Sequence, residues 1–288
     1  MRSVTRLAAV PRSGAAAARA ADDAARAAGV DLIELRTGEE VAAAERVFTE
    51  LWSTDGRPPV AAEVLRALSH SGNYVAGAVR DGALVGASAA WLCVGDPGAR
   101  STLHSHITGV RAGAQNGGAG FALKLHQRAW ALRRAIDMIV WTFDPLIRRN
   151  AYFNLARLGA VVTEYHQHFY GDMVDAVNAG DDSDRCVASW DLIAARANPA
   201  PVEAPTGAVV LLDEHEGRPV AGDPVGEGAV ALIAVPEDIQ ALRATDRALA
   251  REWRVAVRDA LGGALAAGFV ADGMTRSGRY VLRRKATP

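Results

Sequence analysis

The chain has 288 residues, enough for one large domain or two modest ones, and its content of 50% hydrophobic and 23% charged residues is that of an ordinary globular protein. The 32 Lys and Arg residues nearly balance 33 Asp and Glu residues, which argues against a nucleic-acid-binding surface, because such a surface needs a basic excess. No run approaches the roughly 18 apolar residues of a membrane span, and two cysteines indicate neither a metal cluster nor a disulfide framework.

The N-terminal segment is rich in Ala and Arg and poor in large apolar side chains. Asp22 and Asp23 interrupt the arginine-rich pattern that a transit peptide would need, and a secretory signal would need an apolar core that is missing. We therefore expect residues 1–28 to form a disordered or fraying helical extension, and we expect the protein to be cytoplasmic.

The next part of the chain predicts strands and helices in a fixed order. Thr37-x-x-Glu40 is a capping box that opens a helix, and Asp81-Gly82 between two alternating apolar runs is a strong β-hairpin signal. The order is strand, helix, helix, three strands and a helix. These elements cover residues 31–36, 37–52, 60–70, 73–80, 83–94, 101–110 and 121–132.

A glycine-rich turn joins the strand 101–110 to the helix that follows. Gly117, Gly118 and Gly120 remove side chains where the backbone must turn sharply. The first amides of a helix have no acceptor within the helix and lie at the positive end of its dipole, so this turn predicts an anion site. Neither the Gly-Lys-Ser/Thr end of a Walker A loop nor the spacing of a dinucleotide fingerprint is present. A glycine-rich strand-to-helix turn without a ligand is the alternative.

The rest of the chain predicts further strands and helices. A buried strand over 136–143 precedes a short helix over 150–158 that Gly159 ends. Residues 195–207 read as a linker, and we expect 208–288 to be a smaller α/β module that covers the acceptor side of the first domain or forms a homodimer. The remaining elements cover residues 160–170, 185–192, 208–212, 230–235, 245–267, 269–272 and 279–284.

The order Gln115-x-x-Gly118-x-Gly120, after a strand and at the start of a helix, resembles the pyrophosphate-binding signature of GNAT-superfamily N-acyltransferases. The predicted element order over 31–192 and the run Leu158-Gly159-Ala160, with Ala151 on the preceding helix, extend the resemblance. It implies a GNAT fold over residues 29–194, a mixed and mostly antiparallel sheet flanked by helices. The runs HSHITGV, WTFDPL and RNAYFN resemble one subgroup of predicted acyltransferases, some relatives of which are associated with N-succinylation of amino acids.

The resemblance also implies a cosubstrate, acetyl-CoA or another acyl-CoA such as succinyl-CoA. Lys124 would add charge one turn into the helix, or it is an ordinary exposed lysine. For Asn150 and Asn154, the alternative is a position on the helix surface without a ligand. The implied cofactor-binding residues are Thr108, Gly109, Val110, Gln115, Asn116, Gly117, Gly118, Ala119, Gly120, Asn150 and Asn154.

His104 and His106 lie two residues apart on the strand before the loop, so both side chains should project from one face. A histidine with a pKa near 6.5 can take a proton from an ammonium group directly or through water. We predict that these histidines are the catalytic bases, with packing under the sheet as the alternative. Two histidines could also bind a metal, but no third ligand is evident, so we expect none.

Asp144, Arg148 and Arg149 follow the strand 136–143 at its carboxyl end, where open α/β sheets bind ligands. An arginine can hold a carboxylate with two hydrogen bonds, which would suit an amino-acid acceptor or a succinyl donor. We predict that these three residues bind the substrate, a small-molecule amine, with structural ion pairing as the alternative.

One position departs from the family pattern. Many GNAT enzymes carry a tyrosine four residues before the glycine that ends this helix, where it protonates the departing thiolate, and this chain has Leu155 there. The prediction is a CoA-dependent N-acyltransferase that moves an acetyl or succinyl group to a small amine by direct attack. The alternatives are a non-catalytic acyl-CoA-binding or regulatory protein, and a nucleotide-phosphate binder that takes ATP or NAD.

Overall fold

The computed structural model describes residues 12–53, 55–95, 100–171, 181–194, 200–224 and 230–284. The chain divides into two compact units, Met1–Ile139 and Val140–Pro288. Within the described residues, no helix has the length and apolar character needed to cross a membrane.

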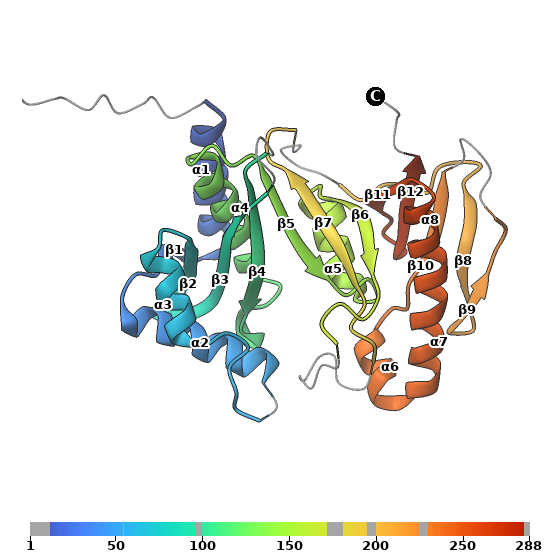
Figure 1. Cartoon of the computed structure of the whole chain (residues 1–288), viewed down its shortest axis with the longest axis horizontal. Helices are drawn as coiled ribbons and strands as arrows, with labels where there is room; N and C mark the ends of the chain where they lie inside the picture. Colours follow the sequence, from blue (N-terminus) through green and yellow to red (C-terminus); the bar gives the residue numbers. More distant parts are fainter. Residues whose placement is uncertain are drawn as a thin grey trace, which may run out of the picture. The chain divides into compact units, whose positions relative to one another are not determined.

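The first unit is built on an antiparallel sheet with the strand order β1-β2-β3-β4 (Figure 1). Asp81 and Gly82 form the turn between β2 and β3, both with positive φ, so the predicted hairpin is confirmed. The strands are β1 (Asp31–Glu34), β2 (Tyr74–Arg80), β3 (Ala83–Cys93) and β4 (Thr102–Val110).

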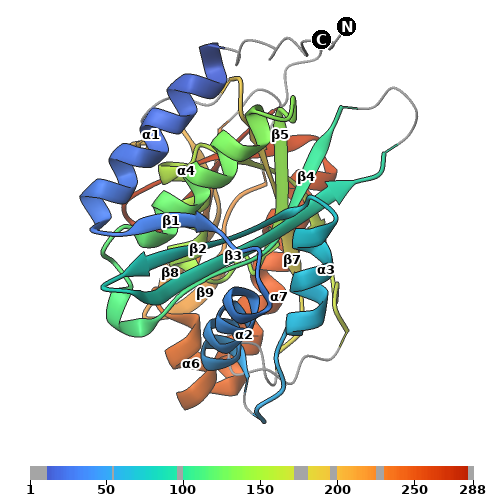
Figure 2. The same cartoon turned by 90° about the vertical axis from the view of Figure 1, so that its left-hand side faces the viewer.

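Helices cover both faces of this sheet, α2 (Gly38–Trp52) and α3 (Ala62–His70) on one side and α1 (Arg12–Ala28) and α4 (Ala119–Leu132) on the other (Figure 2). The predicted capping box opens α2. The Thr37 hydroxyl accepts from the Glu40 amide at 3.3 Å, and the Glu40 carboxylate accepts from the Thr37 amide at 2.8 Å. One apolar cluster joins α2 and α3 to β2 and β3, and a second joins α1 and α4 to β2.

Helix α1 corrects the expectation of a disordered or fraying N-terminal extension. Residues 12–28 form a continuous helix that packs beside α4, and residues 1–11 lie outside the described residues. The buried positions recur every four residues or fewer, as on one face of a helix. Alanine is the strongest helix former, and its small side chain lets two helices approach closely, so a low content of large apolar residues did not mean disorder here. The buried positions are Ala17, Ala21, Ala25 and Ala28.

The second unit contains a mixed sheet with the strand order β5-β7-β6-β11-β12-β10-β8-β9. Strands β8 and β10 are parallel, and the other described pairs are antiparallel. Strand β5 begins two residues before the boundary between the units. The strands are β5 (Met138–Phe143), β6 (Val161–His166), β7 (Arg185–Asp191), β8 (Val209–His215), β9 (Arg218–Ala221), β10 (Ala231–Ala234), β11 (Phe269–Met274) and β12 (Arg279–Arg284).

The predicted order of elements over residues 31–192 is confirmed, and so is the mixed, mostly antiparallel sheet flanked by helices. The division into units differs from the predicted domains 29–194 and 208–288. Val162 of β6 pairs with Ala271 of β11, so one sheet continues from the predicted first domain into the predicted accessory module. A linker-like composition marks an exposed connection, but it does not show which strand edges pair across it.

The helices of the second unit are α5 (Arg148–Tyr152), α6 (Ile239–Thr245), α7 (Arg247–Val257) and α8 (Gly263–Ala266). The long helix predicted over 245–267 is confirmed as an unbroken helical run over 247–266, which Asp246 caps at its start and in which a π-helical turn, Arg258–Gly262, joins α7 to α8. Gly262 faces the Tyr165 ring, where a Cβ would lie at an ordinary contact distance of 3.5 Å.

Candidate functional site

The two histidines lie at a β-bulge in β4. Ala89 and Ala90 of β3 pair with Ile107 and Ser105, so His106 is the extra residue of the bulge. The indole ring of Trp91 contacts both imidazoles, with centroid distances of 5.1 Å to His104 and 4.6 Å to His106. The two imidazole centroids are 6.0 Å apart. The predicted placement of both histidines on one face is therefore confirmed.

Both histidines have a pKa below the ordinary value for an imidazole. Desolvation lowers the pKa of His106, and desolvation together with the charges of His106 and Lys124 lowers that of His104. His106 is exposed and His104 is partly exposed. Two imidazoles that stay neutral at pH 7 and reach solvent can accept a proton, which is what a general base requires.

The glycine loop leads from β4 directly into α4. A short 3₁₀ turn over Ala112–Ala114 precedes four exposed residues, Gln115 to Gly118. The Gln115 side-chain Nε2 donates to the Val110 carbonyl at 3.0 Å, which ties the loop back to the end of β4. Gly118 is the N-cap of α4 with φ at 90°, and no side chain caps the helix. The first amides of α4 are therefore open to an anion.

The end of β4 is held by the sheet and by α2. A Cβ at Gly109 would lie 2.5 Å from Leu51 and 2.6 Å from Trp52, so packing against α2 requires glycine here. The Thr108 hydroxyl lies 2.7 Å from the Ser88 hydroxyl. The predicted cofactor contacts of Thr108 and Gly109 would therefore come from the backbone of the strand.

Lys124 is neither an exposed lysine nor a charge at the mouth of the loop. Its side chain is buried, and its amine donates to the Ser105 hydroxyl at 2.8 Å and to the Gln127 side chain at 3.4 Å. Gln127 in turn donates to Ser88 at 3.5 Å. Burial lowers the pKa of Lys124 to about 7. Sequence reasoning missed this polar cluster because its members come from α4, β3 and β4.

Asp144 is part of a buried ion-pair cluster, which corrects its predicted role in substrate binding. Its carboxylate accepts two hydrogen bonds from Arg254, both at 3.0 Å, and one from Arg243 at 2.6 Å. Asp181 binds the same two guanidinium groups, at 2.9 Å from Arg254 and 2.6 Å from Arg243. Desolvation raises the pKa of Asp144, but the two arginines outweigh it and hold the pKa at about 2. The alternative of structural ion pairing therefore applies.

The two predicted substrate-binding arginines differ in their surroundings. Arg148 lies over the turn between β11 and β12, where it donates to the Arg276 carbonyl at 3.1 Å. Gly278 leaves the space that the Arg148 guanidinium occupies, since a Cβ there would lie within 2.3 Å of it. Arg149 is exposed. Of the two, only Arg149 keeps its side chain available for a ligand.

Asn154 lies in a π-helical turn over Phe153–Arg157, a deviation from α-helix that is frequent at functional sites. Asn154 is a mostly buried polar residue. Leu155 is buried in the same turn, so an apolar side chain fills the position at which the sequence departs from many GNAT enzymes. Asn150 is only partly exposed on α5.

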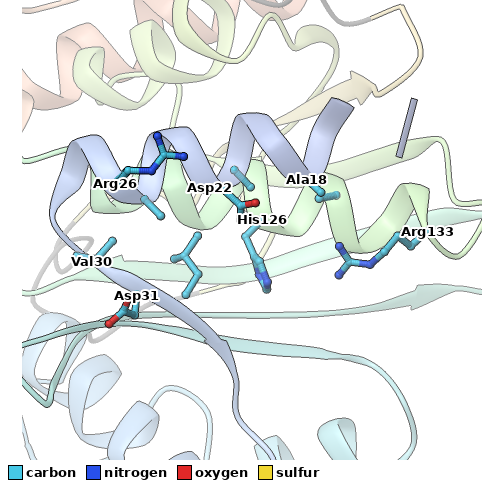
Figure 3. A pocket seen from close by; sticks show the side chains of 11 residues that line it. Ala18, Asp22, Arg26, Val30, Asp31, His126 and Arg133 are labelled. Atoms are coloured by element: carbon cyan, nitrogen blue, oxygen red, sulfur yellow. The ribbon is translucent and has the colours of Figure 1, made fainter. Parts of the chain in front are cut away.

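A cavity of about 420 Å³ lies between α1, α4 and β1 (Figure 3). His126 extends into it from α4, and its Nδ1 lies 3.0 Å from the Tyr74 hydroxyl. Charged side chains of both signs, including Asp22, Asp31 and Arg133, line the cavity beside alanines. Among the described residues, no group of three or more His, Cys, Asp or Glu side chains is placed to hold a metal ion.

No protein-family model matches the chain, and no curated protein matches its sequence. The chain is similar to the solved structure of yncA from Salmonella typhimurium with its cofactor acetyl-CoA, at 17% identity and a TM-score of 0.46 over 60% of this chain and 99% of that one. It is similar to the ribosomal-protein-S18-alanine N-acetyltransferase of Escherichia coli, at 13% identity and a TM-score of 0.45 over 57% and 94%. It is also similar to an acetyltransferase of the GNAT family from Streptococcus pneumoniae, at 11% identity and a TM-score of 0.45 over 56% and 97%. At these identities and TM-scores, the named activities describe those proteins and are not assigned to this chain.

Proposed function

We propose that the chain is a CoA-dependent N-acyltransferase of the GNAT type, which moves an acetyl or succinyl group from acyl-CoA to the amine of a small molecule. One observation carries the proposal. A single strand, β4, holds two neutral, solvent-reaching imidazoles at a bulge and then runs into an exposed glycine loop that opens α4. A candidate base and a candidate phosphate site are thereby fixed to one element.

The cofactor site of the first unit is formed mainly by backbone groups. The amides from Gly117 to Gly120 at the start of α4 would hold the pyrophosphate, because they lie at the positive end of the helix dipole without a side-chain cap. Gln115 and Asn116 shape the loop, the first through its bond to Val110 and the second through a left-handed φ of 62°. Asn154, a mostly buried residue in the π-helical turn, stays a proposed cofactor residue.

The chemistry is attack by an amine nitrogen on a thioester carbonyl, which bound acyl-CoA supplies. His104 or His106 takes the proton of the acceptor ammonium, so that the nitrogen lone pair is free. A C–N bond forms and the C–S bond breaks. The attacking nitrogen gives its second proton to solvent water, and the CoA thiolate takes a proton from the imidazolium or from water. With Leu155 in place of a tyrosine, the protein provides no phenol at that position for this last step.

The acceptor is proposed to be a small amine, and Arg149 offers an exposed guanidinium for a carboxylate on an amino-acid acceptor or on a succinyl donor. Asp144 and Arg148 are not part of this proposal, since both are engaged inside the second unit.

The test is release of CoA thiol from acetyl-CoA and succinyl-CoA in the presence of a panel of amines, with wild type and the double variant His104→Gln, His106→Gln. We expect amine-dependent CoA release that the double variant loses while it still binds acyl-CoA. Binding of acyl-CoA without release under any amine would favour the non-catalytic alternative that Leu155 raises. Binding of ATP or NAD without CoA binding would contradict both the acyltransferase proposal and the non-catalytic acyl-CoA-binding alternative.

A further inference from the structure

Helix α1 ends against the glycine loop. Ala25 and Ala28, in the last turns of α1, share an apolar cluster with Ala119 and Ala122 in the first turn of α4. A Cβ at Gly118 would lie 3.4 Å from the Cβ of Ala28. The end of the N-terminal helix and the start of the loop-borne helix are therefore in direct contact.

Arg80, the last residue of β2, connects the end of α1 with this loop. Its guanidinium donates to the Ala28 carbonyl at 2.8 Å and to the Gly29 carbonyl at 3.3 Å. A helix end presents carbonyl groups without partners at the negative end of the dipole, and a cation is stabilised there. A Cβ at Gly117 would lie 3.6 Å from Arg80 Nη2, so the same guanidinium borders the loop.

Within the described part of the chain, no carboxylate neutralises the charge of Arg80, whose guanidinium donates to the two carbonyl oxygens. Neutral carbonyl groups fix the orientation of the guanidinium and leave its full positive charge in place. Arginine binds phosphate more specifically than lysine does, because its planar fork donates two parallel hydrogen bonds. A fixed guanidinium beside exposed backbone amides is a combination suited to a phosphate group.

We propose that Arg80 binds the pyrophosphate of acyl-CoA and that α1 positions it through the carbonyls of Ala28 and Gly29. This inference rests on the proposed function. The pyrophosphate is the phosphate group assigned, rather than the 3′-phosphate, because Arg80 borders Gly117, inside the loop whose amides would hold the pyrophosphate. Helix α1 then belongs to the cofactor site of the first unit, although its sequence predicts a disordered or fraying extension.

The test is calorimetric titration of CoA and of 3′-dephospho-CoA into wild type, Arg80→Met, Arg80→Lys and the control Arg46→Met, whose arginine is exposed on α2. Loss of a charge-assisted phosphate contact should weaken binding about tenfold or more. We expect Arg80→Met to weaken both ligands equally, Arg80→Lys to restore part of the loss, and Arg46→Met to match wild type. Equal affinity of wild type and Arg80→Met would overturn the inference, and a loss for CoA alone would overturn the assignment to the pyrophosphate.

The salt dependence of binding separates a phosphate contact from a purely structural role. The CoA affinity of wild type should fall more steeply with NaCl concentration than that of Arg80→Met, because one charge contact is gone in the variant. Parallel salt dependences would assign Arg80 to helix capping alone and reject the proposal. If wild type binds no CoA species at all, the proposed function fails, whereas binding by wild type that Arg80→Met leaves intact rejects only the role of Arg80.

Discussion

Replacement of Lys124 by methionine should stabilise the first unit at neutral pH and lose that advantage in alkali. The amine is buried, and burial lowers its pKa from 10.5 to about 7. Because each pKa unit corresponds to about 1.4 kcal/mol, the folded state disfavours the ammonium form by roughly 4–5 kcal/mol relative to the unfolded chain. Methionine of similar length removes this cost but also removes the hydrogen bonds to Ser105 and Gln127, worth about 1 kcal/mol each. The expected net gain at pH 6.5 is about 2–3 kcal/mol.

The sign of the pH dependence follows from proton binding. Between the folded pKa and the unfolded value the unfolded chain binds more protons at Lys124, so the stability of wild type rises with pH in that window. Below the pKa of Lys124 in the folded state, the ammonium group destabilises the fold by its full amount. Above the pKa of Lys124 in the unfolded chain, this destabilisation is absent. The difference in free energy of unfolding between Lys124→Met and wild type should therefore change by about 3 kcal/mol between pH 6.5 and 9.5. Urea unfolding followed by tryptophan fluorescence measures it at each pH.

The matched control is Gln127→Met, which alters the same polar cluster without a titrating group. Its stability difference from wild type should be constant over this pH range. A pH-independent difference for Lys124→Met as well would show that the buried amine does not change its protonation between the folded and unfolded states.

Three further predictions concern the site and its support. His106→Gln should lower kcat for amine acylation, and the pH at which wild-type activity is half-maximal should lie below 6.5, because the pKa values of both histidines are lowered; a half-maximal pH above 7 would contradict this assignment. Gly118→Ala should cost about 1 kcal/mol in a urea titration and weaken acyl-CoA binding, since φ is 90° at this position; unchanged stability and affinity would show that the loop tolerates a side chain. Asp144→Asn should destabilise the second unit by about 3–5 kcal/mol, because Arg254 is left buried without its main counter-charge, whereas the double variant Asp144→Asn, Arg254→Met should recover most of the loss.

The features that the sequence predicts correctly are local ones. The capping box needs only Thr37 and Glu40, and the hairpin turn needs only Asp81 and Gly82, so their spacing along the chain contains the information. The loop that opens α4 is predictable for the same reason.

The features that escape the sequence depend on partners far along the chain. The role of Asp144 is set by Arg254, 110 positions away, and an isolated Asp at a strand end carries no sign of that partner. The burial of Lys124 depends on which face of α4 packs on the sheet. The contact between Arg80 and the end of α1 joins residues about 50 positions apart. Composition did not predict that α1 packs as an ordered helix, because alanine contributes to helix packing without the large apolar side chains that mark a core.

The most direct test of the account is a calorimetric titration of the full chain with acetyl-CoA, with ATP and NAD as comparison ligands. The account predicts saturable binding of one acetyl-CoA per chain that free CoA competes for and that neither ATP nor NAD reproduces. Absence of acetyl-CoA binding, together with saturable binding of ATP or NAD, would contradict the acyltransferase proposal and assign residues 115–120 to a phosphate loop of another kind.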